Sequence, residues 1–440
     1  MIGIPLAFAA LLSVLLLPAS PLPSPPPPAL PRLALIGLDA ADWGVIDPQI
    51  AAGRMPVLKR LIENGSSGTL ASLQPSISPS LWTTIITGKS RHEHGIEGFV
   101  VANSNGQAVP VTANFRKVKA LWNIASEKGL SVGFINWWPS YPAENVNGYI
   151  VSNYLRYLYP QYFAQGEEFQ AQTGAFKSIA FPEELEEMVK ELPSREPEFL
   201  KGLRNFDPRL LEKHGVKPVA DPTFRVKLAN VARVLNHAVA EDELATSMAR
   251  RLLKEKPVDL FGIYLEGIDV LSHLLWPYYR AGEFSVGTEA ARDLGGIIPA
   301  YYEHVDRLVG GMIEGFRPGT DIVIVSDHGY GTETGGKHTH RPEGIIILSG
   351  PSFRKGGRIA GASLYDVAPT LLYLLGLPIA RDLPGKALLD AFTDDFRAAH
   401  PPAWVDSYET PGEKPAPREA IVTPLDEATR EKLRTLGYIK

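Results

Sequence analysis

Short apolar segments alternate with helical patterns along most of the chain, and this alternation constrains the fold more than any other feature. A run that is apolar throughout is typical of a strand buried on both faces of a parallel sheet. Such runs lie at 33–38 (LALIGL), 132–136 (VGFIN), 259–265 (DLFGIYL), 321–326 (DIVIVS) and 344–348 (GIIIL). Strands that alternate with helices predict an α/β domain with a largely parallel central sheet.

Helical periodicity fills the intervals between these runs. One pattern begins at Asp366, a residue that can cap a helix, and ends at Gly376 with Pro378 just beyond. We expect helices at 55–64, 230–253, 298–313 and 366–375, and one more near the C-terminus at 424–438.

The first 31 residues differ from the rest of the chain. Residues 2–17 carry no charge, and their length fits a signal-peptide core but falls short of a standard membrane span. Residues 1–20 are therefore predicted to be a signal peptide or anchor. No basic residue precedes Arg32, so an uncleaved anchor and a misassigned start codon remain alternatives. Residues 21–31 are rich in proline and predict an extended linker. The expected location is extracytoplasmic, periplasmic or secreted, with or without a membrane anchor.

The remainder is predicted to form one catalytic domain at 32–400 and a C-terminal tail at 401–440. Within the domain, residues 155–235 break the alternating rhythm and mix aromatic, acidic and basic residues with irregular apolar spacing. We interpret them as a cap inserted over the sheet, where substrate selectivity would be set. A helical insertion with a purely structural role is the alternative.

Composition excludes several kinds of site. The 440 residues contain no cysteine, which leaves no disulfide, thiol nucleophile or thiolate metal site. A metal site in this chain must therefore use Asp, Glu and His. The 44 basic and 49 acidic residues give a net charge of −5, and no basic tract occurs, so binding to a nucleic-acid polymer is not expected.

Acidic and imidazole side chains follow several of the predicted strands. The carboxyl ends of strands line the binding crevice of an open parallel sheet, so these side chains are expected to meet there. Asp and His together suit Zn²⁺ or a similar divalent ion, and three of each would be enough for two ions. Each residue taken alone has a structural reading as a turn former, cap or surface pair. The candidates are Asp39, Asp269, His273, Asp327, His328, His338 and His340.

A nucleophile candidate lies in PSISPSLWTTIITG at 75–88. Ser78 directly precedes Pro79 and an apolar run, a pattern that predicts Ser78 as a helix N-cap and Pro79 as the first helical residue. A helix N-terminus favours a phosphate, and a serine activated there by a metal could attack phosphorus. The alternative is that Ser78 only caps the helix.

At this point the motifs match a known family. The chain resembles the type I phosphodiesterase/nucleotide pyrophosphatase family of the alkaline phosphatase superfamily over about residues 33–380. The matching motifs are GLDAADW at 37–43, SPSLWTTIITG at 78–88, HGI at 94–96, YLEGIDVLSH at 264–273, SDHG at 326–329, HRPEGIIILSGP at 340–351 and LYDVAPTLLYLLGLP at 364–378.

The resemblance implies an alkaline-phosphatase-like α/β/α sandwich with two zinc ions at the strand ends. One ion would be held by Asp39, Asp327, His328 and the nucleophile Ser78. The other would be held by Asp269, His273 and His340. His340 is preferred over His338 because it stands directly before R-P-E-G, where the resemblance resumes.

Three departures from related patterns bear on specificity. The nucleophile position is usually Thr in this family, and Ser78 keeps a hydroxyl there. Nucleotide pyrophosphatases typically read H-G-I-x-x-N, whereas this chain has Phe99 in place of the Asn, which removes an expected phosphate contact. Sulfatases use a C/S-x-P-x-R motif that this chain lacks, so a sulfatase is disfavoured. His94 in the HGI motif is expected to fix a loop through hydrogen bonds.

The leading hypothesis from these residues is a metal-dependent phosphoric ester hydrolase of the phosphodiesterase type. Its substrate would be a small phosphate ester or a lipid- or glycan-linked one. One alternative is a membrane-associated transferase that passes a phosphoryl-linked head group to a lipid or glycan. Another is a non-catalytic binding protein on the same fold, which the intact ligand set argues against.

Overall fold

The structure, a computed structural model, describes residues 32–155, 178–190, 199, 209–216, 228–333, 337–410, 419–423 and 426–439. The predicted signal segment or anchor (1–20), the linker (21–31) and most of the predicted cap (155–235) lie outside these residues. Within the described part of the chain, every helix is too short or too polar to cross a lipid bilayer.

The described residues build a central sheet of nine strands. In spatial order the strands are β13 (Gly357–Ser363), β2 (Gly65–Ala71), β12 (Glu343–Ser349), β9 (Asp321–Val325), β1 (Leu33–Leu38), β8 (Leu260–Leu265), β5 (Val132–Ile135), β6 (Gly148–Val151) and β7 (Ala180–Phe181). The five consecutive strands from β9 to β6 run parallel, and β2 and β13 form a further parallel pair. The predicted α/β class with a largely parallel sheet is confirmed.

Strand β12 runs antiparallel to both of its neighbours, β2 and β9. Its apolar run is buried on both faces, and such a run does not distinguish a parallel from an antiparallel strand. The sequence did not predict strand β2, because GSSGTLA is neither apolar throughout nor alternating in polarity. Its small residues instead permit close backbone contact: a Cβ on Gly68 would lie 2.0 Å from the carbonyl oxygen of Ile359 in β13.

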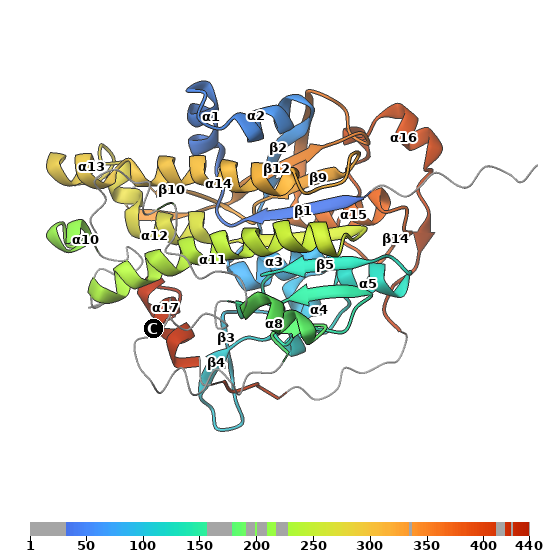
Figure 1. Ribbon diagram of the computed structural model, residues 1–440, viewed down its shortest axis with the longest axis horizontal. Helices are drawn as coiled ribbons and strands as arrows, with labels where there is room; N and C mark the ends of the chain where they lie inside the picture. The colour runs from blue at the N-terminus through green and yellow to red at the C-terminus, as the bar shows by residue number, and fades with distance from the viewer. Residues whose placement is uncertain are drawn as a thin grey trace, which may run out of the picture. The chain divides into compact units, whose positions relative to one another are not determined.

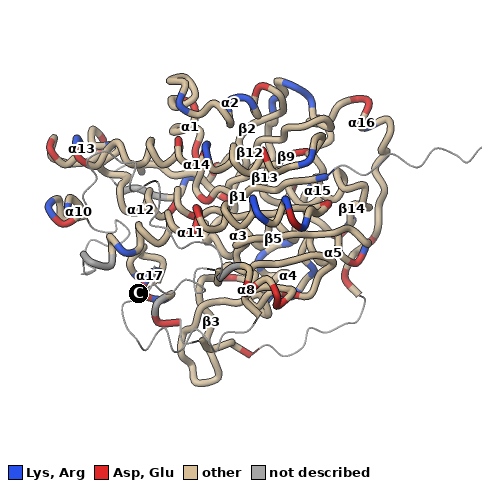
Figure 2. Tube along the Cα trace, in the orientation of Figure 1, with Lys and Arg blue, Asp and Glu red and all other residues tan. Residues whose placement is uncertain are grey.

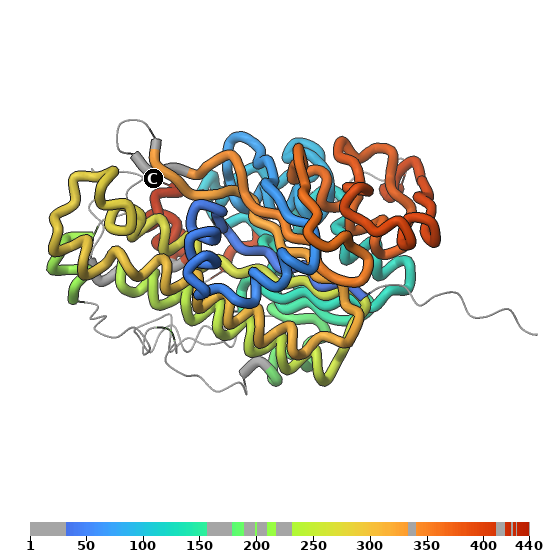
Figure 3. Tube along the Cα trace, turned by 90° about the horizontal axis from the view of Figure 1, so that it is seen from above, coloured from blue at the N-terminus to red at the C-terminus, as the bar shows by residue number. Residues whose placement is uncertain are grey.

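Helices cover both faces of the sheet, as the two views in Figure 1 and Figure 3 show for the long helices α11 and α14 on one side. This first face carries α1 (Trp43–Ala51), α2 (Pro56–Glu63), α11 (Leu228–Glu255), α12 (Gly267–Tyr279) and α14 (Ile297–Ile313). The opposite face carries α3 (Ser78–Thr87), α5 (Leu121–Glu127) and α15 (Val367–Leu374). The arrangement is an α/β/α sandwich, and α2, α11, α14 and α15 confirm four of the predicted helices.

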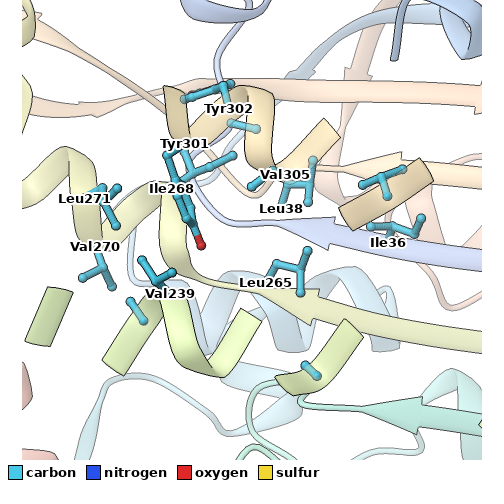
Figure 4. Packing of buried hydrophobic residues seen from close by; sticks show 14 of the residues in the cluster. Ile36, Leu38, Val239, Leu265, Ile268, Val270, Leu271, Tyr301, Tyr302 and Val305 are labelled. Carbon is cyan, nitrogen blue, oxygen red and sulfur yellow. The ribbon is translucent and has the colours of Figure 1, made fainter. Parts of the chain in front are cut away.

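Alternate residues of the central strand β1 point into two separate hydrophobic cores, as the period of two in a strand requires. Leu33 and Leu35 pack with α3, α5 and α15. Ile36 and Leu38 pack on the other face, where Figure 4 shows them with Val305 of α14. Because helices cover both faces of the sheet, the carboxyl ends of its parallel strands are where a site is expected.

Shorter elements lie around this sandwich. They are α4 (Arg91–His94), α8 (Glu184–Lys190), α10 (Arg209–Lys213), α13 (Thr288–Leu294), α16 (Asp394–Ala399), α17 (Asp426–Leu436), and the strand pairs β3 (Val100–Ala102) with β4 (Ala108–Pro110), β10 (Gly329–Glu333) with β11 (Lys337–Arg341), and β14 (Ile379–Ala380) with β15 (Trp404–Val405). Helix α17 confirms the predicted C-terminal helix. Charges of both signs lie on the surface elements in Figure 2, for example on α10 and α13, where Lys213 pairs with Glu289 at 2.7 Å.

The borders of the predicted cap join the main body. Strand β7 extends the sheet by pairing antiparallel with β6, and α11 begins at Leu228. The role of 155–235 in selectivity stays a prediction, because most of those residues lie outside the described part.

Candidate active site

The carboxyl ends of three adjacent parallel strands meet at one edge of the sheet. Strand β1 lies between β8 and β9, and Leu38 at its end is in register with Leu265 at the end of β8. Asp39 follows β1 directly, Asp327 follows β9 by two residues, and α12 begins two residues after β8. The structure therefore brings together the segments that the sequence predicted to meet.

A first group of ligand-type side chains is buried at this edge. The Nε2 atom of His328 lies 3.4 Å from Asp39 Oδ1 and 3.5 Å from Asp327 Oδ2. One ligand atom from each of these three residues lies within 4.8 Å of the others, a spacing that could hold a metal ion. The hydroxyl oxygen of Ser78 lies 3.5 Å from the same Nε2 atom of His328. This group contains the four residues assigned to one ion by resemblance.

Ser78 does not cap its helix, contrary to the sequence expectation. Helix α3 begins at Ser78 itself, Ile77 takes the N-cap position, and Ile77 has no side chain that could form a capping hydrogen bond. Ser78 is 1% exposed, and its hydroxyl oxygen lies 3.5 Å from the His328 imidazole. The hydroxyl thus lies next to the first ligand group, at the end of the helix that carries partial positive charge. A capping role does not explain this position, because the Ser78 side chain does not cap the helix.

The second group adjoins the first. The Nε2 atom of His273 lies 3.0 Å from His340 Nε2 and 3.4 Å from Asp269 Oδ1, and His340 Nε2 lies 3.6 Å from the same oxygen. Asp269 and His273 are one turn apart on α12, and His340 comes from β11. The rings of His340 and His328 stack with centroids 3.9 Å apart, so the two groups share a boundary. The side chain of His338 lies outside the described residues.

Buried carboxylate oxygens in both groups have no hydrogen-bond donor within the described residues. They are Asp39 Oδ1, Asp269 Oδ1 and both side-chain oxygens of Asp327. A buried carboxylate without a partner is costly, and such oxygens are normally satisfied by donors or by a cation. Ligand atoms of Asp269, His340 and His328 also lie within 4.8 Å of one another, so His328 adjoins both groups. The residues present therefore fit divalent metal ions.

The remaining oxygen of Asp39 is held by the protein. The hydroxyl of Tyr264 donates to Asp39 Oδ2 at 2.5 Å, and the indole nitrogen of Trp82 donates to the same oxygen at 3.2 Å. These two donors orient the carboxylate so that Oδ1 faces His328. Tyr264 and Trp82 belong to motifs quoted above, but their apolar surroundings gave no sign of a supporting role.

The electrostatics of the site follow from burial and from crowding of like charges. Burial, with the nearby charges of Asp327 and Asp269, raises the pKa of Asp39 well above its usual range, and burial raises the pKa of Asp327. Burial alone would also raise the pKa of Asp269, but the neighbouring imidazoles, His273 above all, lower it. Burial and the charge of His328 lower the pKa of His340. Cations at this position would relieve the carboxylate repulsion and favour neutral imidazoles.

A pocket of about 500 Å³, counting its part open to solvent, lies against both groups. Asp39, Ser78 and Asp269 line it, together with Trp138 and Asn153. The C-terminal helix α17 also contributes to its wall. Four residues of α17 and one residue after it line the pocket: Thr429, Lys432, Leu433, Leu436 and Tyr438. The polar sequence of 401–440 predicted a tail with one helix at 424–438 and gave no sign that this helix reaches the site.

Comparison with known proteins gives partial matches to curated relatives. The 2,3-bisphosphoglycerate-independent phosphoglycerate mutase of Cereibacter sphaeroides is 38% identical over 98 residues, which is 20% of this chain and 19% of that protein. The enzyme of the same name from Gloeobacter violaceus is 27% identical over 199 residues, which is 42% of this chain and 32% of that protein. The chain thus spans about a fifth to a third of the length of these relatives.

Among solved structures, murine ectonucleotide pyrophosphatase / phosphodiesterase 5 covers 82% of this chain and 100% of its own, with 11% identity and a TM-score of 0.48. A sequence model described as type I phosphodiesterase / nucleotide pyrophosphatase matches residues 33–370, which include every residue of both ligand groups. This match covers well over half of the sequence. The chain belongs to the type I phosphodiesterase / nucleotide pyrophosphatase family.

Proposed function

We propose that the chain is a metal-dependent phosphoric ester hydrolase in which Ser78 is the nucleophile and two Zn²⁺ ions, or similar divalent ions, are bound by the two ligand groups. Asp39, Asp327, His328 and Ser78 would hold one ion. Asp269, His273 and His340 would hold the other. The observation that carries the proposal is the buried Ser78 hydroxyl 3.5 Å from His328, beside carboxylate oxygens that have no donor within the described residues.

Bound divalent ions would supply positive charge to the attacking and leaving oxygens of an in-line displacement. The chain's own residues do the rest. Ser78 Oγ forms a bond to phosphorus while the bond from phosphorus to the leaving oxygen breaks, and the leaving oxygen takes up the proton that the serine gives up. Water then cleaves the Oγ–phosphorus bond, restores the hydroxyl and releases the second product.

The N-terminus of α3 supports the binding of a phosphoryl group at Ser78. Ser78 is the first residue of that helix, Pro79 has no N–H, and the N–H of Ser80 donates to the Ile77 carbonyl at 2.9 Å. The support therefore comes mainly from the helix dipole, which favours a negative charge at this end. The helix would therefore orient a phosphoryl group over the serine. The family's description, type I phosphodiesterase / nucleotide pyrophosphatase, supports a phosphodiester or a pyrophosphate as the substrate class.

The test is hydrolysis of bis-p-nitrophenyl phosphate by the full chain, before and after removal of metal with a chelator and after zinc is restored. We expect turnover that disappears on chelation and returns with zinc. Turnover that is indifferent to chelation would overturn the metal requirement. The same assay with added lipid or glycan acceptors tests the alternative, a transferase. If product is released only when an acceptor is present, the enzyme is a transferase and not a hydrolase.

A further inference from the structure

The C-terminal end of the described chain returns to the candidate active site. Helix α17 packs against α11, α12 and β4, and Figure 1 shows it beside α11 close to the C-terminus. It lies outside residues 33–370, the part matched by the family model. Its contacts with α12 matter because α12 carries Asp269 and His273 of the second ligand group.

Two polar contacts join this end of the chain to α12. Lys432 Nζ forms an ion pair with Glu266 Oε1 at the start of α12, and the two side chains are 12% and 8% exposed. The hydroxyl of Tyr438 donates a hydrogen bond to Asp269 Oδ2. The first contact fixes the helix, and the second reaches a candidate metal ligand directly.

Packing determines where the Tyr438 hydroxyl points. The ring of Tyr438 stacks on the ring of Phe99 with centroids 4.3 Å apart and planes at 22°. The ring of Tyr438 also approaches the ring of His273 edge-on, with centroids 4.8 Å apart, and that of His340, with centroids 6.2 Å apart. Phe99 stands where nucleotide pyrophosphatases typically have Asn, so this departure from the usual pattern supplies the surface that holds Tyr438 in place.

The hydrogen bond divides the two oxygens of Asp269. Oδ2 accepts from Tyr438, whereas Oδ1 has no donor within the described residues and lies 3.4 Å from His273 Nε2 and 3.6 Å from His340 Nε2. Asp39 shows the same division, with Oδ2 held by Tyr264 and Oδ1 left toward the first group. Each ligand group thus contains one aspartate whose Oδ2 accepts a hydrogen bond from a tyrosine hydroxyl.

We propose that Tyr438 is a positioning residue that holds the Asp269 carboxylate so that Oδ1 faces His273 and His340, the residues that would bind the second ion with it. The inference rests on the proposed function, because it requires that the second group bind a metal. Outer partners of this kind fix the orientation of a ligand, and their loss typically weakens metal binding about 10- to 100-fold. The C-terminal segment is therefore part of the metal site rather than a tail.

The test is the affinity of the full chain for zinc, measured by competition with a chromophoric chelator, in the wild type and in Tyr438→Phe. The substitution keeps the ring that stacks on Phe99 and removes only the hydroxyl. We expect wild type to bind two ions and the variant to bind one of them about 10- to 100-fold more weakly. Visible spectra of the cobalt-substituted proteins should show a change confined to one of the two ions. Tyr408→Phe is the matched control, since its hydroxyl donates to the Pro378 carbonyl.

The outcomes separate the inference from the function on which it rests. Two ions bound with equal affinity by wild type and Tyr438→Phe would overturn the positioning role and leave the proposed function standing. A wild-type chain that binds no divalent ion would overturn both. Phe99→Leu provides a second variant, should Tyr438→Phe fold poorly. It keeps the hydroxyl but removes the stacking partner, so a smaller loss of zinc affinity is expected and an unchanged affinity counts against the inference.

Discussion

The Tyr264 hydroxyl lies 2.5 Å from Asp39 Oδ2, and this bond joins the ends of the adjacent strands β1 and β8. It leaves Asp39 Oδ1 toward His328, without a donor among the described residues. We expect Tyr264→Phe to weaken binding of the first ion about 10-fold and to leave binding of the second nearly unchanged, because Asp39 loses the shorter of its two hydrogen bonds and keeps the one from Trp82. Zinc competition is the measurement. Tyr149→Phe is the control, since the Tyr149 hydroxyl is buried without a partner in the described structure.

Removal of the nucleophile should separate catalysis from metal binding. We expect Ser78→Ala to lower kcat for bis-p-nitrophenyl phosphate by roughly 10⁴-fold or more, as loss of the attacking group does in serine hydrolases. The three side chains of Asp39, Asp327 and His328 remain, so zinc should still bind. The assay pairs turnover with zinc content, and a variant that loads zinc and keeps full activity would contradict the role of Ser78.

Removal of one buried carboxylate should change stability in opposite directions with and without metal. In the metal-free protein Asp327 and Asp39 repel one another, and burial raises the pKa of both. We expect Asp327→Asn to raise the free energy of unfolding of the chelated protein by about 1–3 kcal/mol, because one of two crowded, buried carboxylates disappears. In zinc the variant should be the less stable protein, because it has lost a ligand. Thermal unfolding in chelator and in zinc tests this, with Asp395→Asn on the surface of α16 as control.

Space beside the first ligand group is closely filled. A Cβ on Gly37 in β1 would lie 2.5 Å from Cζ3 of Trp82, whose ring is fully buried and whose indole nitrogen donates to Asp39. Gly37→Ala should therefore lower the free energy of unfolding by about 1–3 kcal/mol, the usual cost of overpacking, and should also weaken zinc binding. Denaturant titration gives the first quantity. Gly282→Ala, where an added Cβ meets nothing within 4 Å, should be close to wild type in both.

His94 should make stability depend on pH. Its Nδ1 accepts a hydrogen bond from the backbone N–H of Ile96, and its Nε2 lies 3.1 Å from Thr84 Oγ1. Burial, with the charge of Arg116, lowers the pKa of His94 from 6.5 to about 3. The expected loop-fixing role is consistent with these bonds. Protonation of Nδ1 would break the bond from Ile96, so the folded protein keeps His94 neutral.

The sign follows from that lowered pKa. The stabilising contribution is fully present above pH 6.5 and is lost as the pH falls toward 3, because the unfolded chain binds the proton first. The loss should amount to about 1.4 kcal/mol per pH unit below 6.5. Urea unfolding from pH 7 to pH 5 should show this slope in wild type and in Thr84→Val, which keeps the imidazole. His94→Gln should lack it; equal slopes in all three proteins would show that His94 titrates normally.

Apolar patterning was sufficient to locate the parallel strands. The run at 33–38 coincides with β1, because a strand covered on both faces requires an unbroken apolar sequence and few other structures do. Strands β2 and β13 were missed for the opposite reason. Their glycines and serines serve close backbone packing, as at Gly68 against Ile359, and this leaves no periodic signal in the sequence.

The chemistry of the candidate ligands was also readable from local sequence. Asp39, Asp327 and His328 stand directly after apolar strands, and a parallel sheet gathers such positions at one edge. The position of Ser78 was predicted only to within one helical residue. A serine before a proline can be the N-cap of a helix or its first residue, and the backbone conformation of the preceding loop decides between the two. Here Ile77 is the N-cap and Ser78 is the first helical residue.

The sequence by itself determined the α/β class, the ends of the strands that carry ligands and the kinds of side chain available there, because each depends on residues close together in the chain. Only the tertiary structure decided which carboxylate oxygen remains available and what stands behind it. Asp39 meets Tyr264 and Asp269 meets Tyr438 across separations of 225 and 169 residues. Such pairings depend on strand order and on how α17 docks against α12, and no local pattern of charge or hydrophobicity encodes a contact over that distance.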